Sequence, residues 1–475
     1  MKFDVNYYLN IDMIFILRKN YSHIENSKEG MNKQVSALGT EKISKLLLKQ
    51  AVPASIGILV MSINMIVDTI FVGRWIGVMA IAAITVVLPI VFLISSIGMG
   101  IGIGGSSIIS RALGAKNNAK AFEVFGNQIS LTVGLSFFFV FIGTFLCLPI
   151  LQLFGANGAI INPATDYFHV IIWGVPFLAF AMMGNPVIRA VGKPNYAMFT
   201  LIFPAISNII LDIIFIKYMD LGIYGAGLAT SISYAVSGLF VLWFFLSKNS
   251  ELRIIPKYFT INISILKEII ALGGVTIVRQ GTISLLIIIL NYTLFKYGGE
   301  ISIAIYGIIN RVMMFALFPV LGVTQGFLPI AGYNYGANNI DRVRKTINTS
   351  ILFGTGIAAI IFILIMIFPT ELVGVFTEDK DLLKLTPNAL IIAFLATPVI
   401  TTQLIGSAYF QAAGKALPAL ILTLLKQGIF LIPLVFILPK FYGINGVWMA
   451  FPIADILSTI VTYIYLKKEI RLNLK

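Results

Sequence analysis

Twelve long apolar runs take up most of this 475-residue chain. A helix that crosses the hydrocarbon core of a membrane needs about 20 apolar residues, and each run reaches roughly that length. In chain order the runs are residues 51–73, 78–109, 127–150, 164–188, 195–217, 222–247, 265–295, 301–330, 347–369, 386–410, 416–438 and 443–466. They are continuous, whereas the strands of a membrane β-barrel are short and alternate apolar with polar residues. The sequence therefore predicts an all-α membrane protein with twelve transmembrane helices.

The composition supports a membrane protein and argues against several soluble classes. Charged residues make up 11% of the chain and hydrophobic residues 58%, whereas soluble domains carry about 25% charged residues. The single cysteine, Cys147, excludes an intrachain disulfide. The two histidines, His23 and His169, cannot form the HExxH motif of zinc hydrolases. We therefore expect neither enzyme activity nor a bound cofactor.

The net charge of +14 is explained by where the basic residues lie. Twelve follow the even-numbered runs: Arg111, Lys116, Lys120, Arg189, Lys193, Lys248, Arg253, Lys257, Arg342, Arg344, Lys345 and Lys415. Six follow the odd-numbered runs: Arg74, Lys217, Lys296, Lys380, Lys384 and Lys440. Because basic residues collect on cytoplasmic loops next to anionic lipid, both termini are predicted to be cytoplasmic. No basic patch with interleaved aromatic residues indicates nucleic-acid binding.

The chain also repeats itself at a shift of 222 residues. The segment GNPVIRAVGK (184–193) aligns with GSAYFQAAGK (406–415), and Gly114-Ala115 aligns with Gly336-Ala337. The shift covers six helices, so both copies keep the same orientation in the membrane. The repeat predicts two pseudo-symmetric six-helix bundles related by an axis along the membrane normal.

These boundaries divide the chain into four parts. We expect a cytoplasmic N-terminal tail over 1–45, a first six-helix lobe over 46–247, a cytoplasmic inter-lobe linker over 248–263, and a second six-helix lobe with a short C-terminal tail over 264–475. Met31 opens a segment that reads as a normal lead-in to the first helix. Translation from Met31 and a peripheral tail from Met1 both remain open.

Two acids lie inside apolar runs, where an ionisable side chain is costly and is therefore a candidate for function. Asp68 and Asp212 each have an asparagine one turn earlier, Asn64 and Asn208. Residues four apart share one helix face, so each carboxylate has an amide beside it, and Thr230 adds a hydroxyl. These oxygens suit H⁺ or Na⁺. The alternative is that both acids lie near helix ends and reach the lipid headgroups.

Other side chains are predicted to line a substrate cavity. The candidates besides Asn64 are Tyr167, Met183, Asn185, Arg279, Gln280 and Met313. Methionine equally suits core packing, and Tyr167 equally suits an interfacial anchor. Pro53 removes a backbone hydrogen bond from the first helix and gives that helix a hinge.

The second half is expected to contain basic residues but no carboxylate in mid-span. Arg279 lies near the middle of its run and is expected to face the cavity. Arg311 suits a functional role or a structural anchor equally well. An acidic first half and a basic second half place the coupling-ion chemistry in the first half.

Seven segments together resemble one transporter family. They are VDTIFVG (67–73), SRALGAKN (110–117), RAVGKPNYAM (189–198), SNIILD (207–212), YGAGLAT (224–230), GYNYGANN (332–339) and QAAGK (411–415). Their order and spacing over residues 45–470 resemble the multidrug and toxic compound extrusion (MATE) transporters. The segment LGG…RQG (272–281) further resembles the MepA-like bacterial branch.

The resemblance implies an antiporter with two six-helix lobes around a central cavity. In archaeal and bacterial members the first-lobe ion site corresponds here to Asp68, Asn208, Asp212 and Thr230, with Tyr167 and Asn185 nearby, and Pro53 matches a proline at which helix 1 bends. The NorM-like branch has acids in helices 7 and 10. This chain has Arg279 and Gln280 at the helix 7 location and no acid in 386–410, so a second-lobe Na⁺ site of that type is not expected.

The sequence and the resemblance together predict a multidrug efflux antiporter in the cell membrane. It is expected to act as a monomer and to export cationic and amphiphilic organic compounds in exchange for H⁺ or Na⁺ by alternating access. One alternative is a flippase of lipid-linked precursors from the same superfamily, whose anionic substrates suit Arg279 and Arg311. The other is an intramembrane enzyme, although the runs show no nucleophile–base pair.

Overall fold

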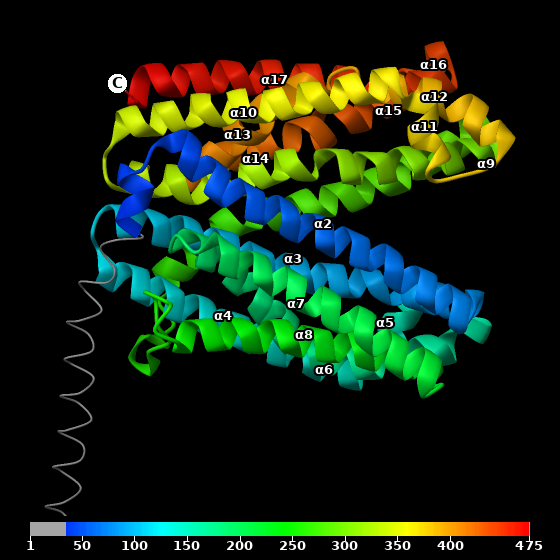
Figure 1. Ribbon diagram of the computed structural model, residues 1–475, viewed down its shortest axis with the longest axis horizontal. Helices are drawn as coiled ribbons and strands as arrows, with labels where there is room; N and C mark the ends of the chain where they lie inside the picture. The colour runs from blue at the N-terminus through cyan, green and yellow to red at the C-terminus, as the bar shows by residue number, and fades with distance from the viewer. Residues whose placement is uncertain (1–34, 475) are drawn as a thin grey trace, which may run out of the picture.

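The structure, a computed structural model, describes residues 35–474 and is helical almost throughout (Figure 1). The choice between Met1 and Met31 lies outside the described residues. The first half contains α2 (Ile43–Trp75), α3 (Val78–Gly114), α4 (Asn118–Phe145), α5 (Cys147–Leu153), α6 (Ile161–Ala190), α7 (Pro194–Asp212), the π-helix η2 (Ile213–Tyr218) and α8 (Gly222–Leu246). The second contains α9 (Ile263–Gly336), α10 (Ile340–Ile367), α11 (Pro369–Gly374), α12 (Lys380–Phe394), α13 (Ile400–Ala412), α14 (Ala416–Leu424), the π-helix η5 (Leu425–Leu431), α15 (Ile432–Ile437), α16 (Pro439–Tyr442) and α17 (Ile444–Asn473).

One of these helices, α9, contains two membrane spans. Its 74 residues would measure about 110 Å if straight, more than three times the hydrocarbon core of about 30 Å. Gly299 breaks the helix with φ 67° and ψ −166°, a conformation that glycine adopts without steric cost. Eleven helical stretches of the described chain are long and apolar enough to span a membrane. With α9 counted as two arms, the prediction of twelve transmembrane helices in two six-helix halves is confirmed.

The described chain begins and ends on the same face of the molecule. In Figure 1 the start of α2 and the end of α17 lie at the left, and α16 lies at the right. We call the first end the termini face and the other the far face. The connections that follow α3, α6, α8 and α13 all lie on the termini face, as an even number of spans requires.

Small residues join the two halves along a seam. Gly100 on α3 lies against the backbone of Gly273 on α9, so closely that a methyl group on Gly273 would overlap the carbonyl oxygen of Gly100. Gly322, on the second arm of α9, lies in the same way against Ala51 on α2. Gly100 and Gly322 are 222 residues apart, as are Ala51 and Gly273. Small residues let membrane helices approach at backbone distance, and here the internal repeat makes the same contact twice.

The ends of α3 and α9 cross on the symmetry axis. A methyl group on Gly114 would overlap the carbonyl oxygen of Tyr333, and one on Gly336 would overlap that of Arg111. Gly114 and Gly336, and Arg111 and Tyr333, are again 222 residues apart. A contact with two equivalent sides lies on a two-fold axis. The structure therefore confirms the pseudo-symmetry that the repeat predicts.

The buried cores show where the halves meet. One cluster near the termini face adds Ile265 and Ile269 of α9 to helices of the first half. A second adds Leu46 and Leu47 of α2 to helices of the second half. Toward the far face, the cluster around α6 and the cluster around α12 each draw on one half, within residues 35–474. The halves therefore share their core at the termini face and separate toward the far face.

The linker between the halves, residues 247–262, holds a buried carboxyl group. Burial raises the pKa of Glu251 to about 8, although the nearby Lys193 favours its ionised form. Tyr333 of α9 also lies close to it. An ordinary glutamate has a value of 4.5, so the folded protein holds this proton more tightly than the unfolded chain does.

We expect Gly114→Ala to destabilise the closed seam, because the methyl group would overlap the carbonyl oxygen of Tyr333. Overpacking of this kind costs about 1–3 kcal/mol. Gly134→Ala is the matched control, since nothing lies within 4 Å of its methyl position and alanine favours a helix. Thermal unfolding of the purified proteins measures both. Equal melting of the Gly114→Ala variant and the wild type would contradict the seam.

We expect stability to fall as pH rises through the range in which Glu251 ionises. A raised folded pKa contributes stability that is complete below the unfolded value and is lost as pH rises through about 8. Glu251→Gln cannot ionise, so its melting temperature is expected to fall less between about pH 5 and about pH 9. Superimposable pH curves for the two proteins would show that Glu251 is not buried in this way.

Candidate functional site

Two helices of the first half bring the predicted polar residues together. Asn64 and Asp68 lie on α2, and Asn208 and Asp212 lie on α7. The Asn64 Nδ2 atom donates a hydrogen bond to Asn208 Oδ1 at 3.1 Å. One turn further along both helices, the carboxyl groups of Asp68 and Asp212 lie side by side within hydrogen-bonding range. We call Asp68 and Asp212 the carboxyl pair.

The local structure of α7 keeps Asp212 inside the protein. Asp212 has no exposed surface, which rules out the alternative that it reaches the headgroups, and Asp68 is half-buried. The π-helix Ile213–Tyr218 begins at the next residue, and such segments recur at functional sites. Beyond it, Lys217 lies 5.8 Å from the ring centroid of Trp75. The cation that follows Asp212 is thus held at the far face, beside an aromatic ring.

The carboxyl pair lacks the donors that two ionised carboxylates need. Both oxygens of Asp212 are buried without a hydrogen-bond donor among residues 35–474, and so is Asn64 Oδ1. Two carboxyl groups can share a hydrogen bond only when one of them carries a proton, and like charges at this separation cannot both persist. The site therefore has to take up a proton or a small cation.

Hydroxyl groups from two other helices border the carboxyl pair. Tyr167 on α6 has its hydroxyl beside that of Thr230 on α8, and Thr230 Oγ1 donates to the Ala226 carbonyl oxygen at 3.0 Å. Tyr234, one turn from Thr230, lies close to Asp68. The sequence analysis missed Tyr234. Its spacing of four residues from Thr230 is the signal that points to it.

Asn185 and Met183 lie elsewhere on α6. Asn185 is about 27 Å along the helix from Tyr167, toward the termini face. Its Nδ2 donates to the Ala197 carbonyl oxygen and to Thr200 Oγ1, both at 2.7 Å. Met183 is 0% exposed. In this conformation both residues hold helices together rather than line the space around the carboxyl pair.

The remaining predicted residues lie on α2 and on the two arms of α9. Arg279 and Gln280 are half-buried on the first arm, and Arg311 is exposed on the second. Met313 packs at the edge of the far-face core of the second half. Helix α2 runs unbroken through Pro53, at the level where α2 meets the second arm. Its role as a hinge stays a prediction.

The prediction that the second half has no mid-span carboxylate is wrong. Asp455 lies eleven residues into α17 and is 7% exposed. Lys426 of η5 meets it with Nζ 2.6 Å from Oδ1. Both residues lie inside long apolar runs whose hydrophobicity conceals them.

An apolar cavity of about 440 Å³ opens between the halves toward the far face. Ile66 of α2 contributes one wall, and Phe315 of α9 and Leu364 of α10 contribute others. Ile66 is two residues from Asp68 on α2. The far-face opening thus combines an apolar surface with a nearby acidic site.

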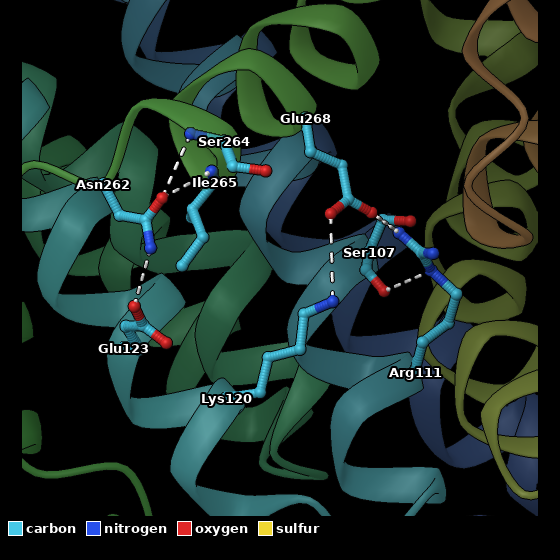
Figure 2. Close-up of polar contacts among 8 residues, drawn as sticks. All are labelled: Ser107, Arg111, Lys120, Glu123, Asn262, Ser264, Ile265 and Glu268. Carbon is cyan, nitrogen blue, oxygen red and sulfur yellow. Dashed lines mark hydrogen bonds and ion pairs between the residues drawn. The ribbon is translucent and has the colours of Figure 1, made fainter.

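Polar contacts close the termini face. Glu268, near the start of α9, lies 2.8 Å from Arg111 Nη2 and 4.0 Å from Lys120 Nζ (Figure 2). We call Arg111, Lys120 and Glu268 the latch. In the same view, Asn262 Nδ2 donates to Glu123 Oε1 at 2.9 Å. These contacts tie α3 and α4 of the first half to the start of the second half.

We expect Glu268→Gln to favour opening of the termini face. The side chains of Arg111 and Glu268 are 21% and 33% exposed, and a partly exposed ion pair contributes up to about 1 kcal/mol, or roughly a fivefold shift in the opening equilibrium. A cysteine at Ser106, which lines a small cavity between the halves, reports on opening through maleimide labelling in a Cys147→Ala background.

The exposed Glu300, at the far-face turn of α9, supplies the control variant Glu300→Gln. The control should label at the rate of the parent protein. Equal labelling of the Glu268→Gln and Glu300→Gln variants would show that the latch does not hold the face closed.

Comparison with known proteins agrees with this architecture. The MatE family profile matches residues 53–214 and 276–437, so each half is matched once, as the repeat predicts. The chain is 27% identical over 434 residues to the "Multidrug export protein MepA" of Staphylococcus saprophyticus. That match covers 90% of this chain and 94% of the relative.

Solved structures extend the likeness to the fold. The MATE multidrug transporter DinF-BH, solved in a drug complex, is 39% identical, with a TM-score of 0.84 over 92% of this chain and 98% of that one. A MATE family transporter described as an outward-facing conformation is 26% identical, with a TM-score of 0.85 over the same shares. The chain therefore belongs to the MatE family, among multidrug efflux transporters of the MepA type, and is a transporter rather than an enzyme.

Proposed function

We propose that this protein exports organic cations and other amphiphilic compounds across the cell membrane in exchange for H⁺ or Na⁺. The carboxyl pair carries the proposal. Asp68 and Asp212 lie side by side, and the buried oxygens of Asp212 have no donor within the described chain. A small cation or the positive charge of a substrate can neutralise the pair. Competition between the two couples the flow of one to the export of the other.

We propose that the termini face is cytoplasmic. Twelve basic residues lie on connections of this face and six on those of the far face, which is the asymmetry of the positive-inside rule. The halves share their core at the termini face, so the described state opens outward. The opposite state requires the latch to part.

Outward opening lets the coupling ion reach the carboxyl pair first. Uptake of H⁺ or Na⁺ neutralises Asp68 and Asp212 and removes the attraction that holds a cationic substrate, which then leaves outward. Helix α2 bends at Pro53 as its polar contacts change, and the ion is released after the cavity turns inward. One charge moving down the membrane potential supplies about 2.3 kcal/mol per 100 mV, enough for roughly a 50-fold substrate gradient.

The apolar cavity supports amphiphilic substrates. Its volume of about 440 Å³ is within the range of drug-sized ligand sites. A flat aromatic cation places its rings against Ile66 and Phe315 and its charge toward the carboxyl pair. The relative DinF-BH, solved in a drug complex, supports a small-molecule substrate.

We expect Asp68→Asn to lower ion-driven ethidium efflux from proteoliposomes at least about tenfold, the range expected when one specific charge contact is lost. Asparagine keeps the shape of the side chain but cannot exchange a proton or balance a cation. Asp166→Asn, at an exposed position of α6, is the matched control and should keep wild-type efflux. Wild-type efflux by a folded Asp68→Asn protein would exclude the scheme.

A further inference from the structure

The second half has a charged site of its own that the proposed transport cycle does not use. Lys426 on η5 and Asp455 on α17 form an ion pair with Nζ 2.6 Å from Oδ1. Lys426 is about 15 Å along its span from the termini face, and Asp455 is about 17 Å along α17 from the far face. Both therefore lie near the middle of the hydrocarbon core.

The pair occupies the same helix couple as the first-half site. In the first half, α7 supplies Asp212 and α8 supplies Thr230. In the repeat, the chain from α14 through α16 corresponds to α7 with η2, and α17 corresponds to α8. Each of the two kinked spans includes a π-helix. The second half thus places an acid between the same two helices, but adds a lysine where the first half has none.

The two side chains are unequally exposed. The side chain of Asp455 is 9% exposed and that of Lys426 is 22% exposed. The acid is fixed in the protein, whereas the lysine reaches it on a flexible four-carbon stem from a π-helix that packs on α9 at Thr282. Replacing a buried ion pair by apolar residues is often neutral or stabilising, so packing alone does not require this pair.

We propose that the Lys426 ammonium group is a tethered cation that fills a cation site around Asp455. It takes the place of the H⁺ or Na⁺ that a free carboxylate would bind there. The second half then carries no exchangeable ion, and the carboxyl pair of the first half is the sole coupling site. This inference rests on the proposed antiport function and adds its stoichiometry.

The charged neighbours leave Lys426 as the evident partner of Asp455. Helices α14, α15, α17 and both arms of α9 pack around η5. On α9, Arg279 and Arg311 are basic, and the acids Glu268 and Glu300 lie at the ends of its first arm. Glu469 of α17 lies near the termini face and pairs with Lys415. Within the described chain, Asp455 is the sole carboxylate in the middle of a second-half span.

The test removes the tethered cation and counts the ions that replace it. Proteoliposomes with the membrane potential clamped at zero receive a tenfold ion gradient, H⁺ or Na⁺, and the steady ethidium gradient is measured. Each coupled ion multiplies that gradient by about ten. We expect Lys426→Met to raise it about tenfold over the wild type, because Asp455 now carries a mobile ion.

Two further variants serve as controls. Lys426→Arg keeps a tethered cation, and Lys426→Met with Asp455→Asn removes the site. Both are expected to show the wild-type gradient. An unchanged gradient in Lys426→Met alone would overturn the inference. So would a Lys426→Met protein that fails to fold at every pH and Na⁺ concentration, because a mobile cation would then not replace the ammonium group.

The design separates this inference from the proposed function. If the wild type builds no ion-dependent ethidium gradient, the antiport proposal fails. Thermal unfolding then decides the inference by itself. Acid or Na⁺ should stabilise Lys426→Met more than it stabilises the wild type or the double variant, and an equal effect on all three would overturn the tethered cation.

Discussion

A carboxylate cannot remain charged inside a membrane protein without a partner, and this constraint organises both halves of the molecule. The first half meets it with two carboxyl groups, Asp68 and Asp212, that face each other and have to take up a cation from outside the protein. The second half meets it with Lys426, which supplies a cation to Asp455 from within. One site is therefore exchangeable, and the other is proposed to be permanently filled. A symmetric scaffold acquires an asymmetric function in this way.

The seam makes such an exchange productive. The glycine contacts at Gly100, Gly114, Gly322 and Gly336 bring backbones together at the termini face, and the contacts come in pairs because the repeat generates them twice. Small residues permit close approach without committing long side chains, so the halves are able to part and rejoin. The latch breaks the symmetry, since the position of the repeat that corresponds to Glu268 is the apolar Leu46. Closure at this face thus combines a symmetric packing term with one added electrostatic contact.

Much of the architecture follows from the sequence because the membrane imposes one length and one composition on every span. The twelve runs, the repeat and the pairing of Asp68 with Asp212 all come from hydrophobicity and helix periodicity. Burial and depth do not, because they depend on how each helix is rotated against its neighbours. Asn185 and Met183 therefore lie in the core near the termini face, Tyr234 was missed, and Asp455 was overlooked because its neighbours are apolar.

Ion release upon drug binding tests the central claim most directly. Purified protein in weakly buffered detergent solution receives an organic cation such as ethidium, while a pH indicator follows H⁺ and a selective electrode follows Na⁺. Competition at the carboxyl pair predicts that binding releases about one cation for each drug molecule bound, and that Asp212→Asn abolishes the release. Binding that releases neither H⁺ nor Na⁺ would contradict the account.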